Sequence, residues 1–157
     1  MFAQTAGRRL AGSMVALMLA IFLIIGFAPA RAGARQQLGR RLQMVGLTNH
    51  DRSARGRAEL NFNAKISRYA KDHSRQMANK GFLYHSDDST LIGLLAPYHW
   101  SAGGENVGVG GSLDGLESAF MHSKDHRENI LGRQYDHMAV GVYRDGDTLW
   151  VTVIFYG

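Results

Sequence analysis

Residues 138–157 read MAVGVYRDGDTLWVTVIFYG, and this stretch decides the fold class. Two runs of β-branched and aromatic residues flank Asp145, Gly146 and Asp147. A short turn between two such runs predicts a β-hairpin. Upstream of the hairpin, apolar residues follow a helical period instead. Because helices come first and strands last, without alternation, the sequence predicts an α+β layered domain and not a doubly wound sheet.

Two upstream segments carry the helical period. Residues 36–52 and 63–81 each place apolar side chains on one helical face, and Gly81 is expected to end the second helix. Residues 82–102 lack clear periodicity, so we expect a long loop there, and loops of that length usually serve a site. Ser112 precedes a further apolar helical face and is expected to be its N-cap.

The first 32 residues are expected to lie outside the folded domain. Arg8 and Arg9 precede an uninterrupted apolar run at residues 14–28, and small residues follow it directly. This order is typical of a secretory signal peptide, residues 1–32, and predicts a secreted or cell-envelope protein. The alternative is that residues 10–28 remain as an uncleaved membrane anchor.

Basic charge is concentrated just after this segment. Residues 31–57 hold seven arginines and one aspartate, whereas residues 58–157 hold nine basic and twelve acidic residues. We expect residues 33–39 to form a basic linker and residues 40–157 to form the domain. The arginines predict contact with an anionic envelope surface or, alternatively, a solvated helix face. No nucleic-acid partner is predicted, because no RNA-binding or helix-turn-helix pattern occurs.

The chain has no cysteine and seven histidines. An exported fold of this composition depends on its hydrophobic core, without disulfides or thiolate metal sites. Imidazole is then the expected metal ligand. His122 and His126 are four residues apart and would share a helical face, but Ser123 stands where the zinc metalloprotease motif needs glutamate.

Residues 103–111 read GGENVGVGG and hold a single charged side chain, Glu105. A dinucleotide-binding fingerprint begun at Gly108 needs glycine where Leu113 stands, and a P-loop needs a Gly-Lys-Ser/Thr sequence that the chain lacks. A carboxylate would also repel a phosphate. We therefore interpret the glycines as allowing tight backbone passage around Glu105.

Four segments occur in a characteristic order: AKDHSRQMANKGFLYHS, GGENVGVG, FMHSKDHRENILGRQYDHMAVGV and LWVTVIFYG. In this order and spacing they resemble the CAP superfamily (cysteine-rich secretory proteins, antigen 5 and pathogenesis-related 1 proteins), in particular its cysteine-free bacterial branch of SCP-like extracellular proteins. The resemblance covers about residues 40–157. It implies a three-layer α-β-α sandwich with a central cleft.

The resemblance also implies a site. Three cleft residues of the family fall on His85, Glu105 and His126. Some members bind Zn or another divalent cation through the two histidines, and others bind sterols, fatty acids or glycans nearby, so a small lipid or glycan is a further candidate ligand. Ser123 stands where the family has a second glutamate, and His122 or Ser123 could substitute for it.

Two functions remain open at this point. The first is a non-enzymatic exported protein that binds a ligand or divalent cation through the cleft, with a coordination position left for water or ligand. The alternative is a metal-assisted hydrolase of peptides or envelope material, with Glu105 as the base. Glu105 could also orient a histidine without touching the metal, or the trio could be a buried polar cluster that braces the loops. We expect a monomer, and the sequence alone assigns no catalytic residue and does not decide whether the protein is an enzyme.

Overall fold

The computed structural model describes the backbone of residues 11–157 and the side chains of residues 31–157. The expected signal peptide (1–32) and its alternative, an anchor at residues 10–28, therefore lie almost entirely outside the described side chains, and both stay predictions. Among helices whose side chains are described, none is long and apolar enough to cross a membrane.

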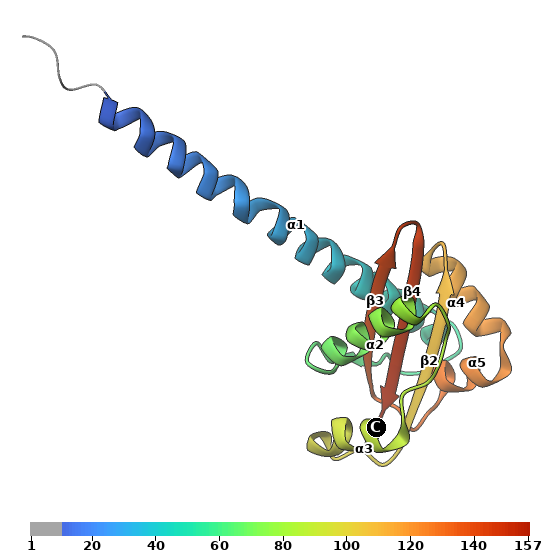
Figure 1. Cartoon of the computed structure of the whole chain (residues 1–157). Coiled ribbons are helices and arrows are strands. Elements are labelled where there is room, and N and C mark those ends of the chain that lie inside the picture. The colour runs from blue at the N-terminus through green and yellow to red at the C-terminus, as the bar shows by residue number, and fades with distance from the viewer. Residues whose placement is uncertain (1–10) are drawn as a thin grey trace, which may run out of the picture. The chain divides into compact units, whose positions relative to one another are not determined.

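The secondary structure follows the order helix, strand, helices, strand, helices, hairpin (Figure 1). The elements are α1 (Ala11–Ser53), β1 (Asn61–Phe62), α2 (Ile66–Lys80), α3 (Asp88–Leu95), the 3-10 turn η1 (Ala96–Tyr98), β2 (Gly103–Gly110), α4 (Leu113–His122), α5 (Lys124–Leu131), β3 (His137–Asp145) and β4 (Thr148–Tyr156).

Helix α1 runs without a break through residues 33–39, so the segment expected as a basic linker is helical. Alanine, arginine, glutamine and leucine favour the helix, and no proline interrupts them there. From Gln37 onward the chain forms one compact unit, Gln37–Gly157.

The four strands of this unit form one sheet in the order β1-β3-β4-β2. Strands β3 and β4 pair antiparallel from His137 opposite Tyr156 to Asp145 opposite Thr148. Gly146 turns the chain between them with φ +55°, which confirms the predicted hairpin. Strand β2 pairs antiparallel with β4 and lies at the edge of the sheet.

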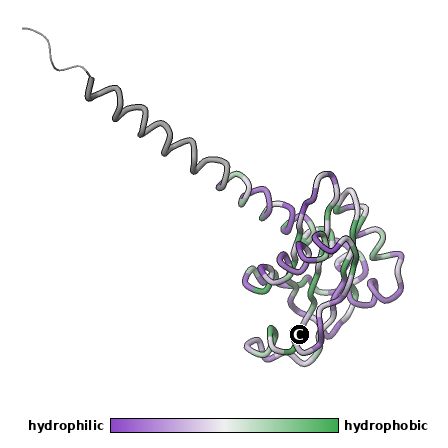
Figure 2. Tube along the Cα trace, in the orientation of Figure 1, coloured by the Kyte–Doolittle hydropathy of each residue, from purple (hydrophilic) through white to green (hydrophobic). Residues whose placement is uncertain are grey.

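Helices cover both faces of the sheet. Helix α2 packs on the face that carries Ala139 and Ile154. The opposite face carries alternate residues of β4, such as Val153 and Phe155, and packs against α4, α5 and Met44 from the last turns of α1. In Figure 2 the hydrophobic colour follows the central strands. The α+β class predicted from the sequence is therefore confirmed.

Helix α2 approaches the sheet unusually closely at Gly141 of β3. A Cβ atom on Gly141 would lie 2.0 Å from the carbonyl carbon of Ala70, far inside van der Waals contact. Two serines of α2 bond to the sheet at the same contact. The backbone N–H of Val140 donates to Ser67 Oγ (3.0 Å), and the hydroxyl of Ser74 lies 2.9 Å from that of Thr152 on β4. The absent side chain of Gly141 sets the distance between the helix and the sheet.

The segment 82–102 is more regular than expected. Helix α3 and the turn η1 occupy residues 88–98 of it, where a long loop was predicted. Helix α3 starts with backbone N–H groups of Thr90 and Leu91 bonded to the carbonyl of Asp87. It is only eight residues long and buries only Leu95, and so short a helix with one buried residue shows no readable period.

Arg52 is a buried arginine that the sequence patterns did not single out. It lies near the end of α1 and is 1% exposed. Its guanidinium donates to the backbone carbonyls of Ala58 (2.7 Å), Ile130 (2.6 Å) and Gly132 (3.0 Å). The charge thus ties the end of α1 to the C-terminal end of α5, and it is not available to an external anionic surface.

Candidate functional site

The glycine-rich stretch forms the edge strand β2. Residues of a strand alternate between the two faces of a sheet. Val107, two residues from Glu105, packs on Met77 of α2, so Glu105 faces the α2 side. Asn106 and Gly108 face α4 and α5, where a Cβ on Gly108 would lie 2.8 Å from the Phe120 ring. The glycines therefore make room for helix side chains, while Glu105 alone adds charge.

The carboxylate of Glu105 is buried and fully engaged. Its Oε1 accepts the backbone N–H of Ser86 at 2.9 Å and lies 2.9 Å from Nδ1 of His85. Its Oε2 accepts the Ser86 hydroxyl at 2.7 Å. Three donor groups are thus directed at the two carboxylate oxygens. Its side chain is only 3% exposed.

His85 sits in the segment that follows α2. Gly81 ends that helix in the left-handed conformation (φ +76°), as predicted. The following segment runs back along α2, because the backbone carbonyl of Tyr84 accepts a hydrogen bond from Nε2 of His73 at 2.9 Å. The His85 side chain is 59% exposed, so one ring nitrogen contacts Glu105 while the rest of the ring faces outward.

A groove of about 430 Å³ lies between this segment and one face of α2, and we call it the α2 groove. Its lining is mostly polar and comprises Tyr69, His73, Gln76, Lys80, Tyr84, His85, Ser86, Asp87 and Thr90. The exposed part of the His85 ring is thus accessible from a concave surface of the size that small ligands occupy.

His126 comes from the other side of the sheet edge. It lies on α5, where its ring packs at 5.0 Å from the ring of Phe120 and its carbonyl accepts from the Asn106 amide at 3.0 Å. Burial lowers the pKa of His126, the nearby His85 lowers it further, and Asp125 opposes the change. The neutral imidazole, which has a free lone pair, is therefore favoured.

The structure brings the three predicted residues together unequally. His85 and Glu105 are in direct contact. His126 makes no hydrogen bond to either of them, and its connection to His85 is electrostatic, because His85 lowers the pKa of His126. Within residues 31–157, no group of three or more His, Cys, Asp or Glu side chains is arranged to hold a metal ion. The described residues therefore offer two imidazoles and one carboxylate that is already occupied.

The accessory candidates lie apart from this contact. His122 is exposed at the end of α4, with Nδ1 2.7 Å from the carbonyl of Ser118. Ser123 joins α4 to α5: its backbone N–H donates to Ala119 and Phe120, and its carbonyl accepts from Arg127. Both residues have local structural partners.

Two residues of the site were missed by the sequence analysis. Ser86 binds both oxygens of Glu105, and the hydroxyl of Tyr69 on α2 donates to Ser86 Oγ at 2.8 Å. Ser86 stood next to His85 in the sequence and could have been suspected for that reason. Tyr69 lies within the predicted helix of residues 63–81, and nothing in the local sequence marks its hydroxyl as part of a site.

Comparisons with known proteins identify the family and the fold of the chain. The family model for the cysteine-rich secretory protein family (CAP) matches residues 45–155. A curated relative, the uncharacterized protein YkwD of Bacillus subtilis, is 26% identical over 113 residues, which are 69% of this chain and 44% of the relative. The chain thus spans less than half of that relative's length.

Solved structures give the same fold. A Bacillus anthracis extracellular protein containing an SCP domain has a TM-score of 0.64 and 26% identity, with 76% of this chain and 41% of the other covered. A cysteine-rich secretory protein from Staphylococcus aureus has a TM-score of 0.62 and 24% identity, with 77% and 39% covered. With most of its length matched by the family model, the chain belongs to the CAP (cysteine-rich secretory protein) superfamily, as a cysteine-free member of the bacterial type.

Proposed function

We propose that this protein is an exported CAP-domain protein that binds a divalent cation, Zn²⁺ first among them, at the cell envelope or outside the cell. The binding atoms are Nε2 of His85 and an imidazole nitrogen of His126. Export is supported by the N-terminal sequence and by the likeness to a protein described as extracellular.

The observation that carries the proposal is the 2.9 Å contact between Glu105 Oε1 and His85 Nδ1. A carboxylate accepts, so Nδ1 donates and the lone pair belongs to Nε2. Carboxylates that hold the second nitrogen of a metal-binding histidine in this way are common, because they fix the ring and increase its basicity.

The donor set suits an open cation site. Both Glu105 oxygens already accept hydrogen bonds from the protein, so the carboxylate orients His85 and is not counted as a ligand. Two imidazoles leave coordination positions for water or for an added donor, in contrast to a closed structural zinc site. A small lipid or glycan remains a candidate for such a position, and the monomeric state remains a prediction.

Zinc titration tests the proposal. We expect isothermal titration calorimetry on the full-length protein to show one Zn²⁺ bound, with affinity at least tenfold lower in His85→Ala and His126→Ala. His122→Ala is the matched control, because it removes an exposed imidazole four residues from His126. Absence of zinc binding by the unaltered protein, or equal binding by all variants, would contradict the proposal.

The hydrolase alternative is less well supported by the geometry. It needs Glu105 as a base for a metal-bound water, but this carboxylate is buried and accepts three hydrogen bonds. Turnover of peptides or envelope material that stops with chelator and in His126→Ala would favour the hydrolase over the binding protein.

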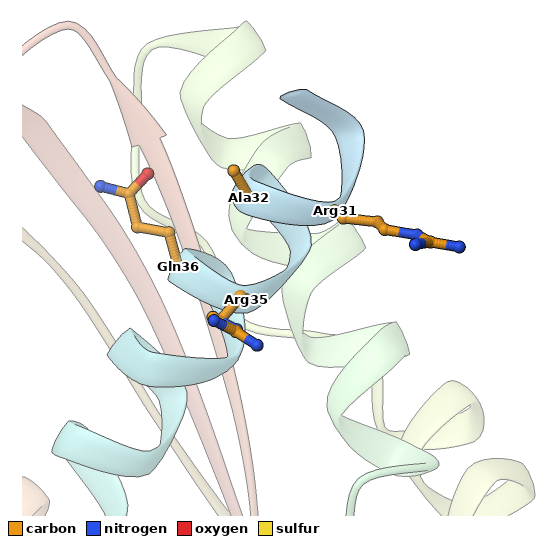
Figure 3. Close-up of a pocket in the computed structure, with 4 residues that line it drawn as sticks. All are labelled: Arg31, Ala32, Arg35 and Gln36. Carbon is orange, nitrogen blue, oxygen red and sulfur yellow. The ribbon is translucent and has the colours of Figure 1, made fainter. Parts of the chain in front are cut away.

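The basic segment supports a second, weaker contact with an anionic envelope surface. Arg31 and Arg35 are exposed, and Figure 3 shows their side chains extending away from α1 beside Ala32 and Gln36. Exposed arginines next to a membrane-directed segment are attracted to anionic lipid. Binding to phosphatidylglycerol vesicles that is lost on Arg31→Gln/Arg35→Gln substitution tests this contact, and equal binding to neutral vesicles would contradict it.

A further inference from the structure

Behind the His85–Glu105 pair, a chain of hydrogen bonds leads back to helix α2. The Tyr69 hydroxyl lies 2.8 Å from Ser86 Oγ, and Ser86 Oγ lies 2.7 Å from Glu105 Oε2. Glu105 Oε1 then contacts His85 Nδ1 at 2.9 Å. Four residues from three different parts of the chain thus form one continuous path.

The direction of each hydrogen bond in this path is determined. An ionised carboxylate only accepts, so the single hydroxyl proton of Ser86 is directed at Glu105. Ser86 Oγ can then only accept from the other side, and the Tyr69 hydroxyl must donate to it. Burial raises the pKa of Tyr69 and the charge of Glu105 adds to that effect, although the bond to Ser86 opposes it. The phenol therefore stays protonated and keeps its donor.

Burial distinguishes the two ends of the path. As whole residues, Ser86 and Glu105 are each 8% exposed, and Tyr69 is partly buried against the loop. His85 alone is largely exposed. An interior network in which every member has its partner holds its side chains in one arrangement, and the low polarity around it strengthens each bond.

We propose that Tyr69 and Ser86 are positioning residues that act through Glu105 on His85. Together they lock the carboxylate in the rotamer that receives Nδ1–H, and so they keep the lone pair on Nε2, the ring nitrogen of His85 that Glu105 leaves free. What Nε2 then binds rests on the proposed function, but the locking of the tautomer does not.

A purely structural role for Tyr69 makes a different prediction. If its hydroxyl only holds α2 against the loop, its removal lowers stability and leaves the His85 tautomer unchanged. Tyr84 provides the matched control. It lines the same groove, and its hydroxyl donates to Gln76 at 3.2 Å, but it has no hydrogen bond to Ser86 or Glu105.

The test is the tautomer of His85, read from the imidazole ¹⁵N signals of metal-free, full-length protein at one fixed pH above neutrality. We expect Nδ1–H in the unaltered protein and in Tyr84→Phe. We expect an Nε2–H population to appear in Ser86→Ala, and to a smaller extent in Tyr69→Phe. An unchanged His85 tautomer in both variants would overturn the proposal.

Zinc affinity gives a separate readout. Loss of a partner behind a metal-binding histidine typically lowers affinity about 10–100-fold, so we expect a fall of about tenfold in Ser86→Ala and a smaller fall in Tyr69→Phe. If no form of the protein binds zinc, the proposed function fails while the tautomer measurement still decides the inference. If Ser86→Ala does not fold, Tyr69→Phe, which removes one hydroxyl, decides it alone.

Discussion

Glu105 on β2 and Glu117 on α4 are both buried, but their hydrogen bonding is opposite. Glu105 accepts three hydrogen bonds from His85 and Ser86. Glu117 is 2% exposed and accepts one, from the Thr48 hydroxyl at 3.2 Å. Its Oε1 has no hydrogen-bond partner among the residues whose side chains the structure describes.

The difference shows that an altered pKa does not by itself mark a functional carboxylate. Burial raises the pKa of Glu117 to about 7, with Thr48 opposing the change and Asp51 adding to it. Altered pKa values are often used to find functional sites. Here an altered pKa points to Glu117, a core residue between α1 and α4. Glu105, the carboxylate next to the exposed His85, is instead identified by its three hydrogen-bond donors.

The largest expected effect is a pH-dependent stability that originates at Glu117. Its folded pKa of about 7 lies above the ordinary value of 4.5, so the folded state binds the proton more tightly. The contribution of Glu117 to the free energy of unfolding is therefore fully present below about pH 4.5. It is lost as the pH rises through 7, by roughly 3 kcal/mol in total. Urea unfolding at pH 5, 6, 7 and 8 measures this, and Glu117→Gln should abolish the fall.

Glu128→Gln is the control for that experiment. Glu128 is an exposed acid of α5, and among residues 31–157 its only ion pair is with Lys124 at 3.6 Å. Its replacement should leave the pH dependence unchanged. If Glu117→Gln and the unaltered protein lose stability equally between pH 5 and pH 8, the assignment to Glu117 is wrong.

The second expected effect is on cation binding, which substitution of Glu105 should weaken and substitution of Glu117 should leave unchanged. Glu105→Gln replaces one acceptor oxygen by an NH₂ donor that faces Ser86 or His85 N–H, so the imidazole loses its support. We expect zinc affinity to fall about 10–100-fold by calorimetry. Glu117→Gln, the same chemical change at the other buried site, should bind zinc as the unaltered protein does. Equal losses in the two variants would remove the distinction between them.

The third effect tests the single hydrogen bond of Glu117. Thr48→Val keeps the shape of the side chain but removes the donor, which should cost about 1–2 kcal/mol at pH 8, where the carboxylate is ionised, and less at pH 5. Urea unfolding at the two pH values measures the difference. Thr48→Ser retains the hydroxyl and should stay close to the unaltered protein. A loss that is the same at both pH values would mean that Thr48 acts through packing alone.

The smallest expected effect concerns His122. Its imidazole is exposed and its Nδ1 faces the carbonyl of Ser118, so His122→Ala should change zinc affinity less than twofold and unfolding free energy by about 0.5 kcal/mol or less. A larger loss of zinc affinity would return His122 to the list of ligands.

Local patterns in the sequence predicted the hairpin, helix α2 with its Gly81 terminus and the Ser112 cap, which accepts from Gly115 N–H at 3.1 Å. These features depend on residues a few positions apart. Strand β2 was not recognised, because its glycines serve neighbouring helices and weaken the strand pattern.

The interior charges escaped prediction for a related reason. Arg52 bonds two carbonyls, and Glu117 bonds Thr48, across about 70 to 80 residues of chain, and no period or motif reports such a separation. His85, Glu105 and His126 were found through family resemblance. The Tyr69–Ser86 bond behind them joins residues 17 apart in the chain, and it became visible only in the folded chain.

The close contact between Gly141 and helix α2 affects the site, although Gly141 has no functional group. Tyr69 immediately precedes Ala70, whose carbonyl occupies the space that a side chain on Gly141 would need. A methyl group there would push α2 outward and carry the phenol away from Ser86. A substitution at Gly141 of β3 would therefore change the orientation of the His85 ring, although β3 is not a neighbour of β2 in the sheet. A substitution at Gly141 would thus alter how His85 is held, with every side chain that lines the α2 groove retained.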